Sequence, residues 1–154
     1  MLLIGPQMKL PNNIPVYGNI EYRGTCPSET LEQVTFFNRL RTRFKDSYGL
    51  IALHPRNEGH RHFRQVAKEK AEGMVKGAAD VIIVGAPAFV CEIKRRDHTK
   101  SQWQEGQQEF LYAAKKAGAF VAIALGADAA SEAFDDYLAV REPERPDEGG
   151  HDGD

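Results

Sequence analysis

Three charged side chains interrupt an otherwise apolar stretch, AADVIIVGAPAFVCEIKRR, at positions 78–96. They are Asp80, Glu92 and Lys94. Strand side chains alternate between two faces, so Glu92 and Lys94 share a face. A tight GAP connection would fold the stretch into a hairpin and bring Asp80, at its start, beside the two later residues. Because unpaired buried charge is costly, these groups must pair with one another or bind an ion.

This grouping of two carboxylates and an ammonium admits two interpretations. In the first, Lys94 forms an ion pair with Asp80 or Glu92, and the cluster is structural. In the second, the carboxylates bind a divalent ion such as Mg²⁺ or Mn²⁺, because Mg²⁺ is typically held by one or two carboxylates together with a phosphate. The ammonium would then orient or deprotonate a metal-activated water and stabilise charge developing on phosphorus.

The segments around the cluster alternate between helical and strand patterns. Ser28 is a suitable helix N-cap, and Gly49 is expected to end that helix. The run FVAIAL is typical of a strand buried on both faces. The expected elements are helix 28–48, strand 50–53, helix 62–74, strands 80–84 and 88–94, helix 103–116, strand 120–125 and helix 128–140. This α-β-α-β-β-α-β-α order predicts a mixed α/β sheet flanked by helices.

Length and composition indicate one globular domain. The chain has 154 residues, of which 42% are hydrophobic and 27% charged, and no apolar run approaches the ~20 residues of a membrane span. The start lacks the features of a signal peptide. Cys26 and Cys91 lie far apart, which favours a reduced, cytoplasmic setting without disulfides. We divide the chain into an irregular lead-in (1–27), a domain (28–140) and an acidic, disordered tail (141–154).

Charge is distributed unevenly along the chain. The tail holds two Arg against six acids, whereas residues 39–76 hold ten Lys and Arg against four acids. Residues 94–100 add four more Lys and Arg against one Asp. A basic region on a near-neutral body permits a polyanionic partner. A solvated helix face explains the same charges equally well.

The spacing from Asp80 to Glu92-Ile93-Lys94 resembles the PD-(D/E)xK nuclease core, which is a restriction-endonuclease-like fold. The flanking sequence resembles its VRR-NUC branch, the virus-type replication-repair nucleases. The shared features are a Gly-containing approach to the Asp, an E-I-K strand, a basic loop, a Gln-bearing helix ending near Gly, and HPRNEGHR upstream. The resemblance covers about residues 28–126. Ala79 replaces the usual Pro, and extra polar residues precede Gln107.

The resemblance implies roles for particular residues. Asp80 and Glu92 would bind Mg²⁺ or Mn²⁺ together with the backbone carbonyl of Ile93. Lys94 would serve the attacking water. Gln107 would position the water, Lys94 or the phosphate, although a solvated helix residue is the alternative for it.

An acid on the first helix often completes such a site, and Glu29 and Glu32 both qualify. At 100° per residue, Glu29 lies roughly 90° from the centre of the apolar stripe and Glu32 about 150° away, on the solvent side. We therefore favour Glu29. Both acids also suit a helix N-terminus without any role in a site. The stripe consists of Leu31, Val34, Phe37, Leu40 and Phe44.

Basic residues near the cluster could line a track for phosphates. The candidates are Arg56, His60, Arg61, Arg64, Arg95, Arg96 and Lys100. Trp103 could stack on an exposed base or anchor a helix by packing. No cysteine accompanies the nearby histidines at zinc spacing, which argues against a zinc site. The roles of His54, Asn57 and Glu58 stay open.

The expected function is that of a metal-dependent DNA endonuclease. The resemblance implies a homodimer acting on branched or Holliday-junction DNA, as in stand-alone bacteriophage and prophage enzymes. The lack of a membrane-length apolar run predicts no membrane association. A catalytically silent nucleic-acid-binding module with the same fold is the alternative, and RNA is a further candidate substrate.

Overall fold

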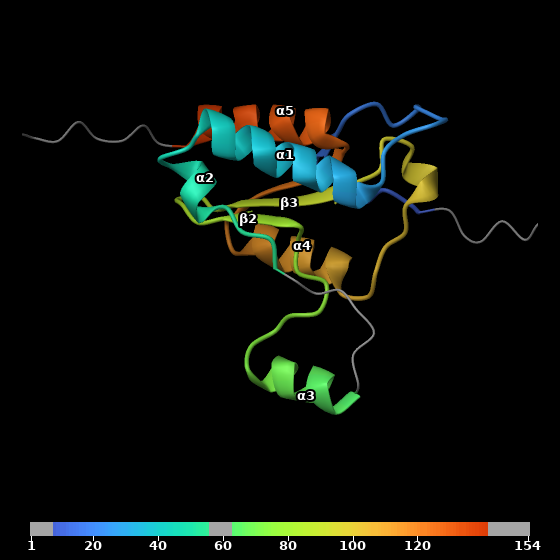
Figure 1. The fold of residues 1–154 in the computed structure, drawn as a ribbon. Coiled ribbons are helices and arrows are strands. Elements are labelled where there is room, and N and C mark those ends of the chain that lie inside the picture. Colours follow the sequence, from blue (N-terminus) through green and yellow to red (C-terminus); the bar gives the residue numbers. More distant parts are fainter. Residues whose placement is uncertain (1–7, 56–62, 142–154) are drawn as a thin grey trace, which may run out of the picture.

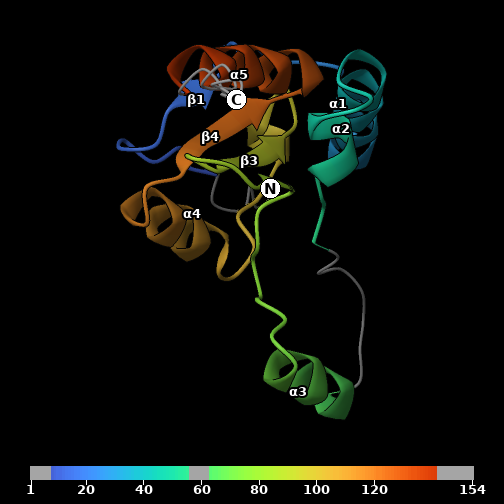
Figure 2. The same ribbon diagram turned by 90° about the vertical axis from the view of Figure 1, so that its left-hand side faces the viewer.

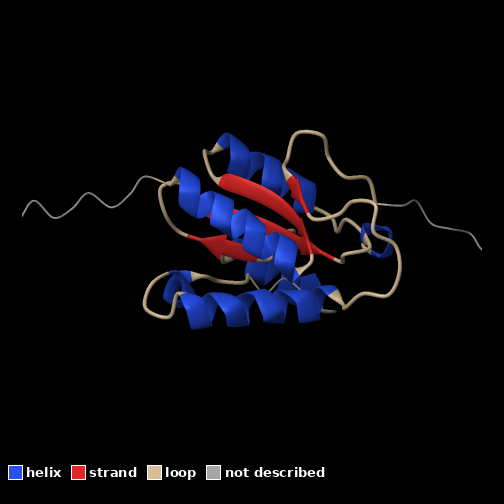
Figure 3. Cartoon of the chain, turned by 90° about the horizontal axis from the view of Figure 1, so that it is seen from above, coloured by secondary structure: helices blue, strands red, loops and turns tan. Residues whose placement is uncertain are grey.

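The computed structural model describes residues 8–55 and 63–141, and it places one mixed sheet between layers of helices (Figure 1). The sheet has four strands in the order β1-β4-β3-β2. Their bounds are Val16–Tyr17 (β1), Val81–Ile83 (β2), Phe89–Lys94 (β3) and Phe120–Leu125 (β4). β1, β3 and β4 are parallel, and β2 runs antiparallel to β3. The predicted mixed α/β class is confirmed, and Figure 3 shows the mixture of helices and strands from above.

Two long helices cover one face of the sheet and a third helix covers the other (Figure 2). Helices α1 (Glu29–Arg43) and α5 (Ala127–Val140) pack on the first face, where Phe89, Cys91 and Ile93 of β3 join the larger hydrophobic core. Helix α4 (Gln107–Lys116) packs on the second face, against Val90 of β3 and its neighbours on β4. Strand β3 is therefore buried along its whole length.

The first helix begins where the sequence predicts but buries a different face. The Ser28 side chain accepts a hydrogen bond from the Leu31 N–H at 3.2 Å, as an N-cap does. Leu31 and Val34, which were expected to face the core, are about half exposed. The buried residues are Glu32, Phe36, Phe37 and Leu40. The predicted stripe therefore lies partly on the outer surface of α1.

The strand predicted at residues 50–53 is wrong. Residues Tyr48–Ile51 form a one-turn helix, α2, and Leu53 makes an isolated antiparallel bridge to Ile82. An apolar run of four residues fits either conformation, because it is too short for its periodicity to distinguish them.

Several helix bounds also differ from the prediction, and α1 ends at Arg43 rather than just before Gly49. Helix α4 begins four residues later than position 103, after a 3₁₀ turn at His98–Lys100 that the sequence did not indicate. Helix α3 (Phe63–Ala71) is shorter than predicted and buries none of its residues. Figures 1 and 2 both show α3 standing away from the sheet and the other helices.

The lead-in packs against the body of the domain. Its short strand β1, which the sequence did not place, pairs with β4, and Met8 and Ile14 are buried. The tail from residue 142 onward lies outside the described residues. Among the residues described, the helices include none with the length and apolar character of a membrane span.

Candidate active site

Asp80 and Glu92 face each other across the antiparallel pair β2–β3. The register pairs Val81 with Cys91, so Asp80 lies opposite Glu92 and points to the same side of the sheet. The Ile93 N–H donates a 2.8 Å hydrogen bond to Oδ2 of Asp80, which fixes that carboxyl group. The two carboxyl groups are also within hydrogen-bonding reach of each other. Both can therefore contact one ion.

Lys94 is buried beside them at the end of β3. Its side chain is 1% exposed. Nζ donates to the carbonyl oxygen of Gln102 at 2.8 Å and to Oε1 of Gln107 at 3.0 Å. It lies 3.8 Å from Oε1 of Glu92. The ammonium is thus held by neutral acceptors, with the carboxylate just beyond hydrogen-bonding distance.

Gln107, the first residue of α4, connects the carboxylate to the ammonium. Its Nε2 donates to Oε1 of Glu92 at 2.9 Å, while its Oε1 accepts from Lys94 and from the N–H of Gln104. This arrangement fixes the orientation of the amide, because only its oxygen can face an ammonium and only its nitrogen can face a carboxylate. The structure thus brings Gln107, Glu92 and Lys94 into one network.

A contact between two glycines brings α4 to the site. Gly77 and Gly106 both have positive φ, and a Cβ on Gly77 would lie 2.3 Å from the backbone carbon of Gly106. Only glycine allows the segment before Asp80 to approach the start of α4 so closely. The Gly-containing approach to Asp80 therefore also determines where Gln107 stands.

Burial raises the pKa of both carboxyl groups. For Asp80 the rise is opposed by the hydrogen bond from Ile93. For Glu92, which is 1% exposed, burial is reinforced by the charge of Asp80 and opposed by Lys94, and its pKa lies well above the usual range. The charge of Glu29 raises both values further. Without a cation, the pair therefore holds a proton to higher pH than isolated carboxyl groups do.

The donor set fits a hard divalent cation. Oε2 of Glu92 is buried and receives no hydrogen bond from the part of the chain that the structure describes. Mg²⁺ in proteins often uses only one or two carboxylates, and water and phosphate oxygens complete its coordination. Within residues 8–55 and 63–141, no three His, Cys, Asp or Glu side chains form a ready-made metal cage. Asp80 and Glu92 would thus supply the protein carboxylates, and ligation by the Ile93 carbonyl stays a prediction.

The fold of this chain is similar to that of a solved protein. The structure superposes on a solved VRR_NUC domain protein with a TM-score of 0.61, covering 79% of this chain and 94% of that chain at 23% identity. The chain has the VRR-NUC fold. This confirms the resemblance drawn from the residues around Asp80 and Glu92. No family model matches the sequence, and a search of curated proteins finds no match.

Within the VRR-NUC fold, the two acids of α1 have different surroundings. Oε1 of Glu29 accepts a 2.6 Å hydrogen bond from the Ser101 hydroxyl, and its charge acts on Asp80. Glu32 is 2% exposed, so its predicted place on the solvent side is wrong. It follows the same i, i+4 stripe as the buried Phe36. Metal binding by Glu29 stays a prediction.

Glu32 serves the packing of α1 against α5. Its Oε2 accepts a hydrogen bond from the N–H of Ala127 at the start of α5, and its Oε1 lies 3.2 Å from Nε of Arg96. The carboxylate therefore satisfies a helix N-terminus and a guanidinium. The sequence signal was its four-residue spacing from Phe36.

The structure engages several of the predicted phosphate-binding residues within the chain. Arg95 donates to the carbonyl oxygens of Cys26 and Pro27, and Arg96 pairs with Glu32. Nζ of Lys100 donates to the carbonyl oxygen of Gly24, and the Arg64 guanidinium lies 6.0 Å from the ring centre of Phe63 on α3. Nδ1 of His54 bonds to the carbonyl oxygen of Asp80. The remaining candidates, Arg56, His60 and Arg61, lie outside the described residues, as do Asn57 and Glu58.

Trp103 has a role that neither sequence interpretation included. The centre of its ring lies 4.8 Å from Nζ of Lys94, and its Nε1 donates to the carbonyl oxygen of Lys9. Trp103 thus covers the ammonium, and its nine-residue distance from Lys94 gave no periodic signal.

Proposed function

We propose that this chain is a metal-dependent nuclease that hydrolyses DNA phosphodiester bonds. One observation carries the proposal: Gln107 joins the buried Glu92 and Lys94 in one hydrogen-bonded network, Asp80 lies opposite Glu92, and a Glu92 oxygen lacks a donor among the described residues. The VRR-NUC fold supports it.

The residues divide the work according to their chemistry. Asp80 and Glu92 would hold Mg²⁺ or Mn²⁺, which when bound supplies Lewis-acid activation of water and neutralises phosphate charge. The Lys94 ammonium would orient the water and stabilise negative charge on the phosphate in the transition state. Gln107 would keep the ammonium in place. The neutral acceptors around Lys94 already fix its ammonium, so Lys94 needs little rearrangement to orient the water and stabilise the phosphate.

The finer features of the proposal come from the resemblance. Branched or Holliday-junction DNA would be the substrate, and a homodimer would cut two strands with its two sites. The setting would be the cytoplasm of a bacterial or phage-infected cell. RNA is the competing substrate class.

A catalytically silent nucleic-acid-binding module is the second candidate. It is supported by the proximity of Lys94 to Glu92, because a buried ion pair with a shared carboxyl proton would also satisfy these charges. This module would bind DNA in a salt-sensitive manner without binding Mg²⁺.

Cleavage of four-way junction DNA, duplex DNA and RNA with Mg²⁺ or Mn²⁺ tests the proposal. We expect Lys94→Met to lose at least about 10²-fold in cleavage rate, because a preorganised charge is removed. Lys116→Met, at the far end of α4, is the matched control and should cleave normally. Absence of cleavage by the wild type on every substrate, or full activity in Lys94→Met, would refute it. Calorimetric titration of Mg²⁺ into wild type and Glu92→Gln separates the nuclease from the silent module.

A further inference from the structure

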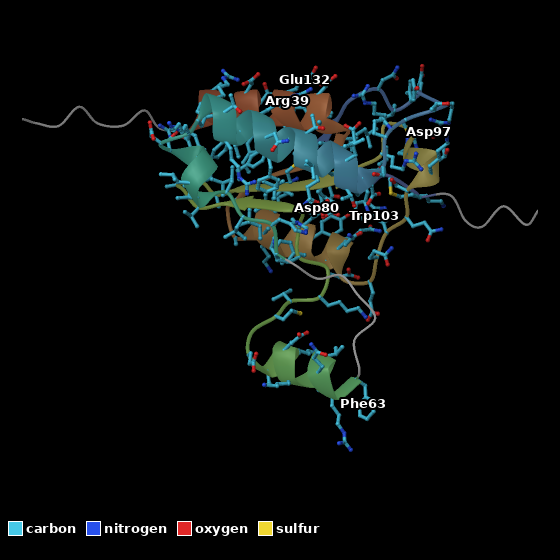
Figure 4. The ribbon with its side chains drawn as sticks, in the orientation of Figure 1. Arg39, Phe63, Asp80, Asp97, Trp103 and Glu132 are labelled. Atoms are coloured by element: carbon cyan, nitrogen blue, oxygen red, sulfur yellow. The ribbon has the colours of Figure 1, made fainter. Side chains whose placement is uncertain are left out.

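The three arginines of α1 differ in their electrostatic surroundings. Arg39 pairs with Asp128 at 2.8 Å and Arg43 with Asp135 at 3.0 Å, both on α5. Figure 4 shows Arg39 on the α5 side of the molecule, beside Glu132 and away from Asp80. Arg41, on another face of α1, has no carboxylate within ion-pair distance among the residues described. Its guanidinium lies 5.2 Å from the ring centre of Phe37. Arg41 is thus the α1 arginine that remains available to an external anion.

Arg41 lines a groove between α1 and the segment after α2. The groove has a volume of about 440 Å³. Gln33, Asn38 and Arg41 supply hydrogen-bond donors on the α1 side, with His54 opposite. Val34 and Leu53 add apolar surface, and none of the described residues that line the groove is acidic. This combination suits a ligand with both anionic and apolar parts.

The groove adjoins the backbone of Asp80. At one end, Nδ1 of His54 lies 2.8 Å from the carbonyl oxygen of Asp80. Along α1, Gln33 and Arg41 both line the groove, and Glu29 lies about one turn before Gln33, toward the start of the helix. Twelve residues at 1.5 Å each place Arg41 about 18 Å from Glu29. That distance corresponds to about five nucleotides along one strand of a duplex.

We infer that this groove holds a nucleic-acid strand on its way to the site, with Arg41 bound to a phosphate about five nucleotides from the scissile bond. The inference rests on the proposed function. A nucleic acid fits because its phosphates match the unneutralised guanidinium, and its sugars and bases match the amides and apolar walls. A second copy of the chain is the competing occupant, but the described residues of the lining include no carboxylate with which one copy could pair with Arg41 of the other.

DNA binding in a chelator tests the groove separately from cleavage. The probe is a short fluorescent DNA duplex, with four-way junction DNA in parallel, titrated at several salt concentrations. We expect Arg41→Gln to weaken binding about two- to fivefold. The slope of log affinity against log salt should become about 0.9 less negative, because one phosphate contact is lost. Arg39→Gln is the matched control, because Asp128 already neutralises Arg39, and it should leave the slope unchanged.

A second pair of variants avoids dependence on a single side chain. Val34→Glu puts a negative charge into the groove, whereas Thr42→Glu puts one on the other side of α1, beside Arg39 and Arg43. We expect only Val34→Glu to weaken DNA binding. Thermal unfolding curves should show that both variants are folded.

The outcomes distinguish the inference from the proposed function. Binding and a salt slope unchanged in Arg41→Gln, in a protein that cleaves DNA, overturn the groove and leave the nuclease intact. If DNA binding depends on Arg41 but the wild type does not cleave, the inference that the groove binds a strand is supported and the proposed nuclease function is refuted. Sedimentation that shows Val34→Glu dissociating a dimer without changing DNA affinity per protomer assigns the groove to a second copy and overturns the inference.

Discussion

The ammonium of Lys94 lies 3.8 Å from the carboxylate of Glu92, two positions earlier on the same face of β3. That separation exceeds hydrogen-bonding distance, so the ammonium and the carboxylate do not hydrogen-bond to each other directly. The Gln107 amide bridges it, with hydrogen bonds of 2.9 Å to Glu92 and 3.0 Å to Lys94. The geometry of the charged pair therefore depends on a neutral side chain from another element.

Replacement of Gln107 by Leu should lower cleavage about 10²-fold, because a small displacement of a catalytic group has an effect of that size. It should also lower the free energy of unfolding by about 1–3 kcal/mol, since a buried carboxylate and ammonium each lose a partner. Gln108→Leu is the control and should change neither strongly. Cleavage kinetics and denaturant unfolding measure the two effects, and equal losses in both variants would contradict the bridging role.

The metal-free protein should lose stability as pH rises above the ordinary carboxyl range. Because the pKa values of Asp80 and Glu92 are raised in the folded state, folding takes up a proton in that range. The unfolded chain therefore binds fewer protons than the folded one, and the free energy of unfolding falls with increasing pH. The limiting slope is about 1.4 kcal/mol per pH unit for each proton.

Thermal and denaturant unfolding in a chelator between pH 4 and 8 measure this dependence. Glu92→Gln removes one of the two charges and should flatten the profile in that range. Saturating Mg²⁺ should also flatten it for the wild type, because a cation offsets the repulsion that retains the proton. A wild-type profile that falls no more steeply with pH than that of Glu92→Gln would contradict the raised pKa values.

The local sequence pattern was enough to predict the two strands that carry the site, but not the helix and loop contacts around them. Alternation and the short GAP turn were enough to place Asp80 beside Glu92, since the strand register follows from the hairpin. The face that α1 buries was misjudged because Leu31 and Val34 are apolar yet exposed, whereas the charged Glu32 is buried. The bonds of Arg95 to the segment before α1 join residues about seventy positions apart, and no local pattern encodes such contacts.

The two acids at the start of α1 should respond differently to neutralisation. Glu32→Gln weakens the contact with the N-terminus of α5 and with Arg96, and it should cost about 1–3 kcal/mol of folding free energy. Glu29→Gln removes a charge that acts on Asp80 and Glu92 from a partly exposed position. It should leave stability within about 0.5 kcal/mol and change the Mg²⁺ concentration needed for half-maximal cleavage. Unfolding curves and metal titrations of the two variants measure these effects. If Glu29→Gln lowered stability more and Glu32→Gln changed the Mg²⁺ requirement more, the roles given to the two acids would be contradicted.

Trp103 should hold Lys94 through the face of its ring. Trp103→Phe retains an aromatic face but loses the indole N–H bond to Lys9, whereas Trp103→Leu loses both. A cation–π contact at a desolvated site contributes up to about 2 kcal/mol, so we expect Trp103→Leu to cleave roughly tenfold more slowly, with Trp103→Phe close to wild type.

The same contact has a spectroscopic readout, because Trp103 is the single tryptophan of the chain. Removal of the ammonium in Lys94→Met should shift its fluorescence emission, and Lys116→Met should not. If Lys94→Met leaves the emission unchanged, or if Phe and Leu at position 103 slow cleavage equally, the ring does not act on the ammonium. Trp103 would then serve only to anchor the lead-in at Lys9.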